Sequence, residues 1–369
     1  MPEKIKVAMI TSNLAMTGIG SVVVNYSKYM NKDKYEVTII AGEPIASSYI
    51  DICLANNITI IKLPSRRLKP KDFYFSLWQV LKKHEYSICH VHGNSATSSI
   101  ELFLAALNGV KVRIMHCHTS ECQHKKMHQL LSPFFKHLYT AAFACSSLAG
   151  NWIFGEEKFK VLQNGFETER FKFNIDKRNM YRSQLGLAGK FVIGHVGQIN
   201  YQKNTEFSIK LFETFFAEND SACLLLVGNG RDRETYEEYI KNSACRDKII
   251  LYGESNDIPG MLSAMDVFIF PSRVEGLGIA VIEAQINGLP CVISDVVPKE
   301  VQVSKNVNFL PIGEENMKKW FLEIMKFGSL NIEREKEYEA NISKIEKFNI
   351  CVCAKVLENE YELLLYKQR

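Results

Sequence analysis

The sequence predicts an α/β protein in which two Rossmann-like domains, each a doubly wound parallel sheet, face each other across a cleft. Short apolar runs alternate with helical stretches, and the runs lack the polar–apolar alternation of half-exposed strands. The pattern loosens near residues 165–175 and restarts at Phe191. A chain of 369 residues is also too long for one typical core. We expect domains at 1–168 and 169–350, and a C-terminal helical segment, 351–369, that can pack back on the first domain.

The first domain is expected to alternate strands and helices. Each expected strand is a short apolar run, and each expected helix repeats apolar residues every three or four positions. The strands are Lys6–Ser12, Glu36–Ala41, Ile58–Leu63, Ile88–His92, Val112–His116 and Ala142–Cys145. The helices are Ser21–Met30, Asp72–Lys83, Ala96–Leu107 and Lys126–Tyr139. Regular alternation of the two element types predicts a parallel sheet.

The second domain repeats this pattern. Its expected strands are Phe191–Gly197, Ala222–Val227, Ile249–Tyr252, Val267–Phe270 and Cys291–Ile293, with helices between them. One of these helices spans Ile279–Asn287, and Gly288 followed by Pro290 is typical of a helix end. A final helix, Cys351–Tyr366, lies well beyond the last expected strand.

Composition places the chain among soluble globular proteins, with 46% hydrophobic and 23% charged residues. No apolar run approaches the roughly 20 residues that cross a bilayer, and the N-terminus has no signal-peptide cleavage site. The ten cysteines have no paired spacing, which indicates reduced core residues. We expect a cytoplasmic protein that can also act at the inner face of the cell membrane.

Charge is distributed unevenly. Residues 1–150 hold 17 Lys and Arg against 9 Asp and Glu, so we expect an anionic partner there, such as a phospholipid surface or a phosphorylated acceptor. The segments Gln123–His137 and Arg66–Lys71 mix cations with apolar residues and can either touch a membrane or form solvated surface. No recognisable module supports nucleic-acid binding.

Two carboxylates, Glu275 and Glu283, interrupt the otherwise apolar stretch Pro271–Ser294. An ionised carboxylate in apolar surroundings is costly without strong donors, and the vicinal hydroxyls of a ribose or hexose supply two donors at once. The backbone between them, Gly276, Leu277 and Gly278 before Ile279, offers N–H groups at a helix N-terminus to a phosphate or sugar oxygen. Alternatively, Glu283 faces solvent and Glu275 is an ordinary loop residue.

Lys203 follows the strand that ends at Gly197, at the edge of the sheet where ligands bind. A lysine there can neutralise a diphosphate, although a solvated surface lysine is the commoner case. The other expected strand ends of this domain also carry glycine or polar residues, as at Gly228 and Gly253, a pattern consistent with a nucleotide cradle.

Two other sites have weaker support. Gly18, Gly20 and Glu43 favour a dinucleotide site, but Val23 stands where a third glycine is expected. The run from His116 to His128 invites a zinc interpretation, yet its spacing matches no familiar site. Imidazoles that touch a phosphate or an acceptor hydroxyl fit better. The chain also has no Asp-x-Asp, so a dedicated divalent-metal site is not evident. We expect no metal site and no cofactor.

Together these residues resemble the retaining, metal-independent glycosyltransferases with two Rossmann-like domains, the B-type (GT-B) fold, and in particular the exopolysaccharide and capsule branch (glycosyltransferase family 4-like). The resemblance covers nearly the whole chain. Its most specific motif is Glu275-x₇-Glu283, with Pro-Ser before it and Gly-Leu-Pro after it. The other motifs are Thr17-Gly18, His118, Asn164-Gly165 and the run from Gly197 through Lys203-Asn204.

The resemblance implies a role for each matching residue. Glu283 would bind the ribose, Glu275 would orient hydroxyls of the transferred sugar, and His118 would lie beside the reacting centre. Lys203 would hold the diphosphate, helped by N–H groups of Gly276–Ile279 and the Gly18 loop, and the loop Gly253–Asp257 would face the base. The activity implied is retaining transfer of a hexosyl or N-acetylhexosaminyl unit, from a donor expected to be UDP-linked, to a growing polysaccharide or lipid-linked oligosaccharide.

One residue departs from the family pattern. Gln198 stands after Gly197 where the family usually has an arginine that pairs with the lysine on the diphosphate. Either Arg231 or Arg273 substitutes, or activity is low, or the donor differs. Three other functions therefore stay open: a nucleotide-sugar epimerase, an NAD-dependent oxidoreductase, and a catalytically weak nucleotide-sugar-binding subunit.

Overall fold

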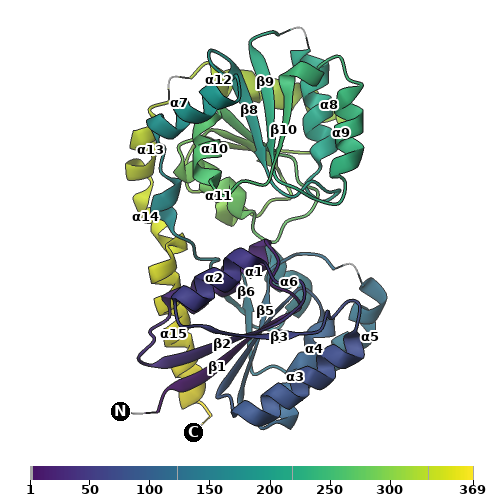
Figure 1. Ribbon diagram of the computed structural model, residues 1–369, viewed down its shortest axis with the longest axis vertical. Coiled ribbons are helices and arrows are strands. Elements are labelled where there is room, and N and C mark those ends of the chain that lie inside the picture. Colours follow the sequence, from purple (N-terminus) through teal and green to yellow (C-terminus); the bar gives the residue numbers. More distant parts are fainter. Residues whose placement is uncertain (1–2, 123, 218, 331, 369) are drawn as a thin grey trace. The chain divides into compact units, whose positions relative to one another are not determined.

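The computed structural model describes residues 3–122, 124–217, 219–330 and 332–368. These residues form two compact units, shown in Figure 1. The first unit comprises Met1–Phe166 together with Lys347–Arg369, and the second comprises Glu167–Glu346. The chain therefore enters the second unit once and returns to the first unit for its last 23 residues.

The first unit is built on a parallel sheet with strand order β3-β2-β1-β4-β5-β6-β7 among the described residues. Its strands are β1 Ile5–Thr11, β2 Tyr35–Gly42, β3 Thr59–Leu63, β4 Ile88–Gly93, β5 Val112–Cys117, β6 Ala141–Ala144 and β7 Lys160–Val161. Its helices are α1 Gly18–Tyr29, α2 Ser47–Ala55, α3 Pro70–His84, α4 Ser99–Leu107, α5 Lys125–Phe135, α6 Ser147–Phe154 and α15 Ile350–Tyr366. The prediction of a doubly wound parallel sheet is confirmed here, whereas α2, α6 and β7 were not predicted.

The second unit repeats this topology with strand order β10-β9-β8-β11-β12-β13, again all parallel in the part of the chain described. Its strands are β8 Phe191–Val196, β9 Ala222–Val227, β10 Ile249–Gly253, β11 Val267–Phe270, β12 Cys291–Ser294 and β13 Val307–Leu310. Its helices are α7 Ile175–Gln184, α8 Thr205–Phe216, α9 Arg233–Lys241, α10 Ile258–Ala264, α11 Ile279–Ile286, α12 Met317–Gly328, α13 Arg334–Ala340 and α14 Ile342–Ile345. Large apolar side chains fill its core, among them Trp320, Phe212 and Phe216.

In both units the strand order reverses direction next to the first strand. The reversal lies between β1 and β4 in the first unit and between β8 and β11 in the second. In open α/β sheets such a switch point, at the carboxyl ends of the strands, is where ligands bind. Among the candidate residues, Gly18 follows β1, Lys203 follows β8 and Glu275 follows β11.

The C-terminal helix α15 belongs to the first unit. Asn349 caps it by accepting a hydrogen bond from the N–H of Cys351, and the N–H of Asn31 donates to the Glu358 carboxylate over 2.7 Å. The hydroxyl of Tyr35 donates to the carbonyl of Glu358. These contacts hold the last helix against α1 and the strand β2 that follows it.

None of the helices in the described ranges combines the length and the hydrophobicity that a membrane span requires.

Candidate functional site

The second unit brings Lys203 and Glu275 together at its switch point. Lys203 follows β8 and Glu275 follows β11, and these two strands are paired in the sheet. The Nζ of Lys203 lies 2.5 Å from Oε1 of Glu275, whose residue is only 7% exposed. A buried carboxylate is tolerated when it is paired and hydrogen-bonded, so the cation stabilises Glu275 in this otherwise apolar loop.

Local hydrogen bonds fix the loop that carries Lys203. The side chain of Asn200 accepts from the backbone N–H of Lys203 over 2.9 Å. Asn204 adopts a left-handed conformation, and its amide donates to the carbonyl of Pro271 over 3.0 Å. This last bond ties the β8 loop to the β11 loop, and the Lys203 ammonium lies 4.8 Å from the centre of the Phe270 ring.

Gly228 allows the loops at the ends of β8 and β9 to touch. A Cβ atom at Gly228 would lie 1.9 Å from the carbonyl oxygen of Gly197, and the backbone of Gly228 has a positive φ. No side chain is compatible with that contact. At this position, the glycine that the sequence shows at the strand end is therefore explained by the close packing of two loops.

Glu283 lies on α11, which starts directly after Gly278 in the left-handed conformation. Its carboxylate has no hydrogen-bond partner among the described residues, and burial raises its pKa to about 7, with Arg170 opposing the shift. Glu283 is therefore partly shielded from solvent and not fully solvated. A carboxyl group of this kind fits a ligand that supplies hydrogen-bond donors.

The remaining predicted residues of the second unit have varied surroundings. Gly276, Leu277 and Gly278 are buried in the loop before Ile279. Asp257 caps α10 through the N–H of Gly260. It also pairs with Lys177 over 2.7 Å and accepts from the Tyr181 hydroxyl. Gly253 ends β10, and its carbonyl accepts from the N–H of Gly228. Asp257 thus has a structural role that the sequence did not reveal.

Neither arginine suggested as a replacement cation contacts Gln198, whose side chain accepts from Asn200 over 3.2 Å. Arg273 donates to the carbonyl of Tyr201 and stacks over its ring at 4.3 Å. Arg231 is exposed, in a loop whose neighbour Asn229 accepts from the N–H of Ile199. Arg231 is therefore the freer cation beside the β8 loop.

In the first unit, Gly18 begins α1 behind the cap formed by Thr17, which accepts from the N–H of Gly20. A Cβ atom at Gly18 would have open space around it, whereas one at Gly20 would lie 2.4 Å from the carbonyl oxygen of Ala15. Gly18 thus leaves room for a ligand near the backbone. Gly20 is explained by packing.

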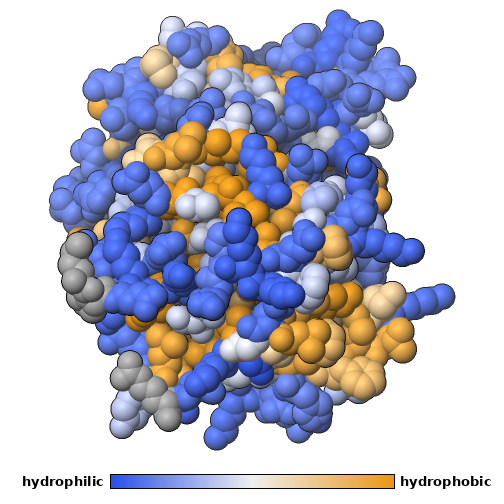
Figure 2. Space-filling view, turned by 60° about the horizontal axis from the view of Figure 1, so that its bottom comes forward, coloured by the Kyte–Doolittle hydropathy of each residue, from blue (hydrophilic) through white to orange (hydrophobic). Residues whose placement is uncertain are grey.

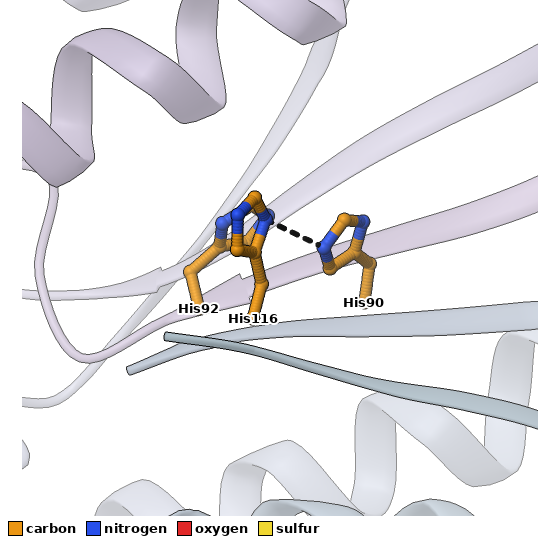
Figure 3. Close-up of side chains that lie close together, drawn as sticks. All are labelled: His90, His92 and His116. Atoms are coloured by element: carbon orange, nitrogen blue, oxygen red, sulfur yellow. Dashed lines mark hydrogen bonds between the residues drawn. The ribbon is translucent and has the colours of Figure 1, made fainter. Parts of the chain in front are cut away.

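Four buried histidines form a block at the ends of β4 and β5. His90 and His92 lie on one strand and His116 and His118 on or just after the other, so all four rings share one face of the sheet. Rings lie close together along each strand: His90 stacks on His92 with centroids 4.3 Å apart, and His118 is tilted against His116 at 4.2 Å. Figure 3 shows three of them.

Hydrogen bonds link the rings across the two strands. Nε2 of His90 lies 3.2 Å from Nδ1 of His116, and Nδ1 of His92 lies 2.9 Å from Nε2 of His118. Burial lowers the pKa of His90 to about 3 and that of His118 to about 4, so the imidazoles are neutral at pH 7. His118 therefore has its ring held by His92, a contact that the sequence did not predict.

The histidine run considered for zinc is not assembled as a unit. His128 lies on α5, where Nδ1 accepts from the N–H of Ala96 and the ring stacks on Trp152. His90 and His92, which lie outside that run, join His116 instead. The only sign of this grouping in the sequence was that two histidines lie two residues apart at the end of each of two expected strands.

The two cationic segments also differ from each other. Arg66 is not a surface cation, because its Nε lies 3.0 Å from the buried Glu101 and donates to the Tyr74 hydroxyl. The lysines of the second segment, Lys125, Lys126 and Lys136, are exposed. Gln123 lies outside the described residues.

Two doubly wound sheets with ligand-type residues at both switch points define a two-domain Rossmann-like protein. Residues 177–344 match the family model described as Glycosyl transferases group 1, and residues 16–170 match the one described as Glycosyltransferase Family 4. The chain belongs to the glycosyltransferases of the GT-B fold.

Curated relatives agree with this family. EpsF of Bacillus subtilis (strain 168), whose name assigns it provisionally to the glycosyltransferases, is 28% identical over 80% of each chain. A UDP-Gal:alpha-D-GlcNAc-diphosphoundecaprenol alpha-1,3-galactosyltransferase of Escherichia coli is 27% identical over 80% of each chain. The capsular polysaccharide biosynthesis glycosyltransferase CapH of Staphylococcus aureus is 25% identical over 79% of this chain and 82% of its own.

Solved structures share the fold. Anabaena HepE in complex with UDP-glucose aligns with a TM-score of 0.79 and 16% identity, covering 97% of this chain and 99% of its own. WaaG, a glycosyltransferase involved in lipopolysaccharide biosynthesis, aligns with a TM-score of 0.71 and 14% identity over the same shares.

Proposed function

We propose that this glycosyltransferase is a retaining enzyme that moves a hexosyl or N-acetylhexosaminyl unit from a UDP-linked donor to a growing polysaccharide or lipid-linked oligosaccharide. The observation that carries the proposal is the Lys203–Glu275 pair at the switch point, with the unpartnered carboxyl group of Glu283 eight residues further along the chain. A nucleotide sugar supplies what these groups lack, namely phosphate oxygens for Lys203 and hydroxyl donors for Glu283. The names of the relatives support the UDP donor and the polysaccharide acceptor.

The roles follow from charge. The Lys203 ammonium has three donors, so it can keep one on Glu275 and turn the others to the diphosphate. The backbone at Gly276–Ile279 and at Gly18 adds N–H groups around the phosphates, and Glu283 takes the ribose hydroxyls. The loop Gly253–Asp257 faces the base, with Asp257 holding its shape.

The reaction breaks the bond between the sugar C1 and the diphosphate oxygen and forms a bond from C1 to the acceptor oxygen. Charge that develops on the departing diphosphate is stabilised by Lys203, and such preorganised electrostatics are usually the largest catalytic term. We propose attack from the same face, with the acceptor proton passing to the departing phosphate oxygen. His118, held by His92, would bind beside C1.

The experiment compares UDP, GDP, ADP and NAD in a thermal-shift screen, because selective binding stabilises the fold. We expect UDP to raise Tm most. Lys203→Ala should weaken UDP binding about 10–100-fold, the range of a charge-assisted hydrogen bond. Lys210→Ala is the matched control, since Lys210 is partly exposed on α8 and pairs with Glu206. Stabilisation by NAD alone would contradict the proposal.

Gln198 favours a second candidate, a nucleotide-sugar-binding subunit with weak catalysis, because its side chain bonds to Asn200 and supplies no charge. Such a subunit would bind UDP but turn over no donor. Product formation from UDP-sugars with a lipid-linked acceptor distinguishes the two candidates.

We further propose that the first unit contacts the inner face of the cell membrane through α3, α4 and α5, of which α4 packs against both of the others. Exposed apolar side chains on and beside these helices are Leu68, Phe75, Phe103, Leu107, Met127, Leu130 and Phe134. Exposed lysines accompany them, at Lys69, Lys71, Lys82, Lys83, Lys125, Lys126 and Lys136. Figure 2, in which the bottom of Figure 1 comes forward, shows hydrophobic residues in the lower part of its view. Apolar anchors with surrounding cations suit an anionic bilayer.

Co-sedimentation with vesicles tests this contact. The protein should sediment with anionic vesicles and much less with neutral ones. Leu130→Asp together with Phe134→Asp should abolish sedimentation, whereas Leu322→Asp, at an exposed leucine of the second unit, should not. Sedimentation that is indifferent to lipid charge and to the double substitution would refute membrane contact.

A further inference from the structure

Three of the four histidines in the block make no direct contact with the reacting groups in the proposed sugar transfer. His90, His92 and His116 are buried in the first unit, and the chain has nine histidines in all. Each offers one ring nitrogen, and these three nitrogens all lie within 4.8 Å of one another. Figure 3 shows the rings gathered side by side, with the His90–His116 contact drawn as a dashed line.

The spacing of these nitrogens is close to that of a metal site. Ligand nitrogens about 2.0–2.1 Å from a tetrahedral ion lie about 3.3 Å from one another. The His90 and His116 nitrogens are 3.2 Å apart, so one edge already has that length. The third nitrogen needs to approach by at most about 1.5 Å to complete the set.

One neighbouring feature points the same way. The Tyr361 hydroxyl, on α15, lies 2.7 Å from Nδ1 of His90 and so leaves Nε2 of His90 facing His116. Metal-bound histidines almost always have their second nitrogen held by such an outer partner.

The uncharged surroundings of the three histidines indicate which kind of ion they would bind. Side chains that touch the rings in the described part of the chain include Met9, Phe143 and Tyr361, all uncharged. The cost of burying an ion rises with the square of its charge, so neutral ligands in a core favour a monovalent cation over a divalent one. The Met9 sulfur lies 3.4 Å from Nε2 of His92, and thioether ligands favour Cu⁺.

We propose that His90, His92 and His116, with Met9 beside them, form a binding site for a soft monovalent transition-metal cation of the Cu⁺ class. The ion would join β4 to β5 and, through the Tyr361–His90 contact, strengthen the attachment of α15. It would take no part in sugar transfer, because His118 alone of the block has a proposed role at the reacting centre.

The test uses the full chain carrying Cys351→Ser, which removes the exposed cysteine and keeps the nine buried ones. Those thiols are buried, and a thiol in an apolar core is a poor competitor for the ion. Metal-free protein is titrated into the coloured Cu⁺–bicinchoninate complex, and loss of absorbance reports transfer. We expect one equivalent of Cu⁺ per chain.

Substitutions locate the bound ion. His90→Gln and His116→Gln should each lower the affinity at least tenfold, whereas His195→Gln should not, because His195 is a buried histidine of the second unit bonded to Ser208. Tyr361→Phe keeps the ring and all three ligands but removes the outer hydrogen bond, and should lower the affinity about tenfold. Circular dichroism checks that each variant is folded; if the histidine variants unfold, Tyr361→Phe decides.

Three results would overturn the proposal. They are no stoichiometric uptake of Cu⁺, uptake that is unchanged in all the folded variants of the block, and preferential uptake of Zn²⁺. In the first two cases the 3.2 Å contact is an ordinary hydrogen bond between neutral rings.

Discussion

The Nζ of Lys203 lies 2.5 Å from Oε1 of Glu275, although 72 residues separate them in the chain. The cation proposed for the diphosphate is therefore already shared with the carboxylate proposed for the sugar. The diphosphate of an incoming donor therefore has to compete with Glu275 for the hydrogen bonds of the Lys203 ammonium. This competition gives the two residues different signatures in binding and in turnover.

Glu275→Gln should separate these signatures. UDP alone should bind the variant as tightly as the parent or up to about tenfold more tightly, because Lys203 no longer serves a competing anion. Turnover of the sugar donor should fall roughly 100-fold or more, the scale of losing one preorganised partner of the reacting group. Calorimetry with UDP and a product assay measure the two quantities. A large loss of UDP affinity would show that Glu275 positions Lys203 instead of competing with the diphosphate.

Donor affinity should rise with pH through about 7, where Glu283 titrates in the free protein. Hydroxyl donors favour the ionised carboxyl group, so binding lowers its pKa and releases a proton. Between pH 6 and pH 8 the ionised fraction grows about tenfold, and the affinity for a UDP-sugar should grow similarly. A UDP-sugar suits this measurement because both of its phosphates are esterified and neither titrates there. In Glu283→Gln the affinity should be lower and no longer depend on pH.

The same carboxyl group should make the folded protein less stable at alkaline pH than at acidic pH. Its folded pKa of about 7 lies above the ordinary value of 4.5, so the folded state keeps the proton longer. This stabilisation is full below about pH 4.5 and is lost as the pH rises through 7. Relative to the parent, Glu283→Gln should therefore gain about 2 kcal/mol between pH 5.5 and pH 8.5. Thermal melts at the two pH values measure the difference, and an equal Tm change at both would contradict it.

Arg231 and Arg273 should differ in their effect on diphosphate binding. Arg273 is held by Tyr201, whereas Arg231 is exposed beside the β8 loop that carries Gln198. Arg231→Ala should weaken UDP binding by about tenfold, as expected for one lost charge-assisted contact, and Arg273→Ala should change it little. Titration calorimetry of both variants measures this, and the reverse order would assign the second cation to Arg273.

Arg66→Ala should destabilise the first unit strongly. The substitution leaves the buried Glu101 without its cation, a loss of about 3–5 kcal/mol for a broken buried pair. Arg67→Ala is the matched control, because Arg67 is exposed and a surface change stays within about 0.5 kcal/mol. Urea unfolding of the two variants gives the comparison. Equal midpoints would mean that Glu101 finds another partner.

Most of the two sheets could be predicted because their signals are local. An apolar run such as Phe191–Val196 needs only its own residues to identify a buried strand. Elements with weak local signals were missed, including the two-residue β7 and β13, where Asn308 interrupts a run of four residues. The helix expected at Lys126–Tyr139 ends at Phe135, shortly after Pro133, a residue that cannot donate to the helix.

The candidate site was predictable only in part. Its residues were predicted because they are polar residues or glycines that follow expected strands. This places them at one edge of a sheet but does not show which of them touch. The Lys203–Glu275 pair, the role of Asp257 in capping α10 and the block around His116 involve partners on different strands or helices. No pattern of spacing along the chain specifies which side chains meet there.

By itself, the sequence determined two parallel sheets, the glycine and carboxylate positions of the second unit and the likeness to glycosyltransferases. The spacing of apolar residues and the positions of turn residues are local signals, because each involves only a few neighbouring residues. They can therefore be recognised from the sequence alone. The tertiary structure decided that α15 rejoins the first unit, that Arg66 is buried against Glu101, and that Tyr361 reaches His90 across 271 residues. Such contacts depend on how whole elements pack, because closing a long loop is repaid only when many side chains come together.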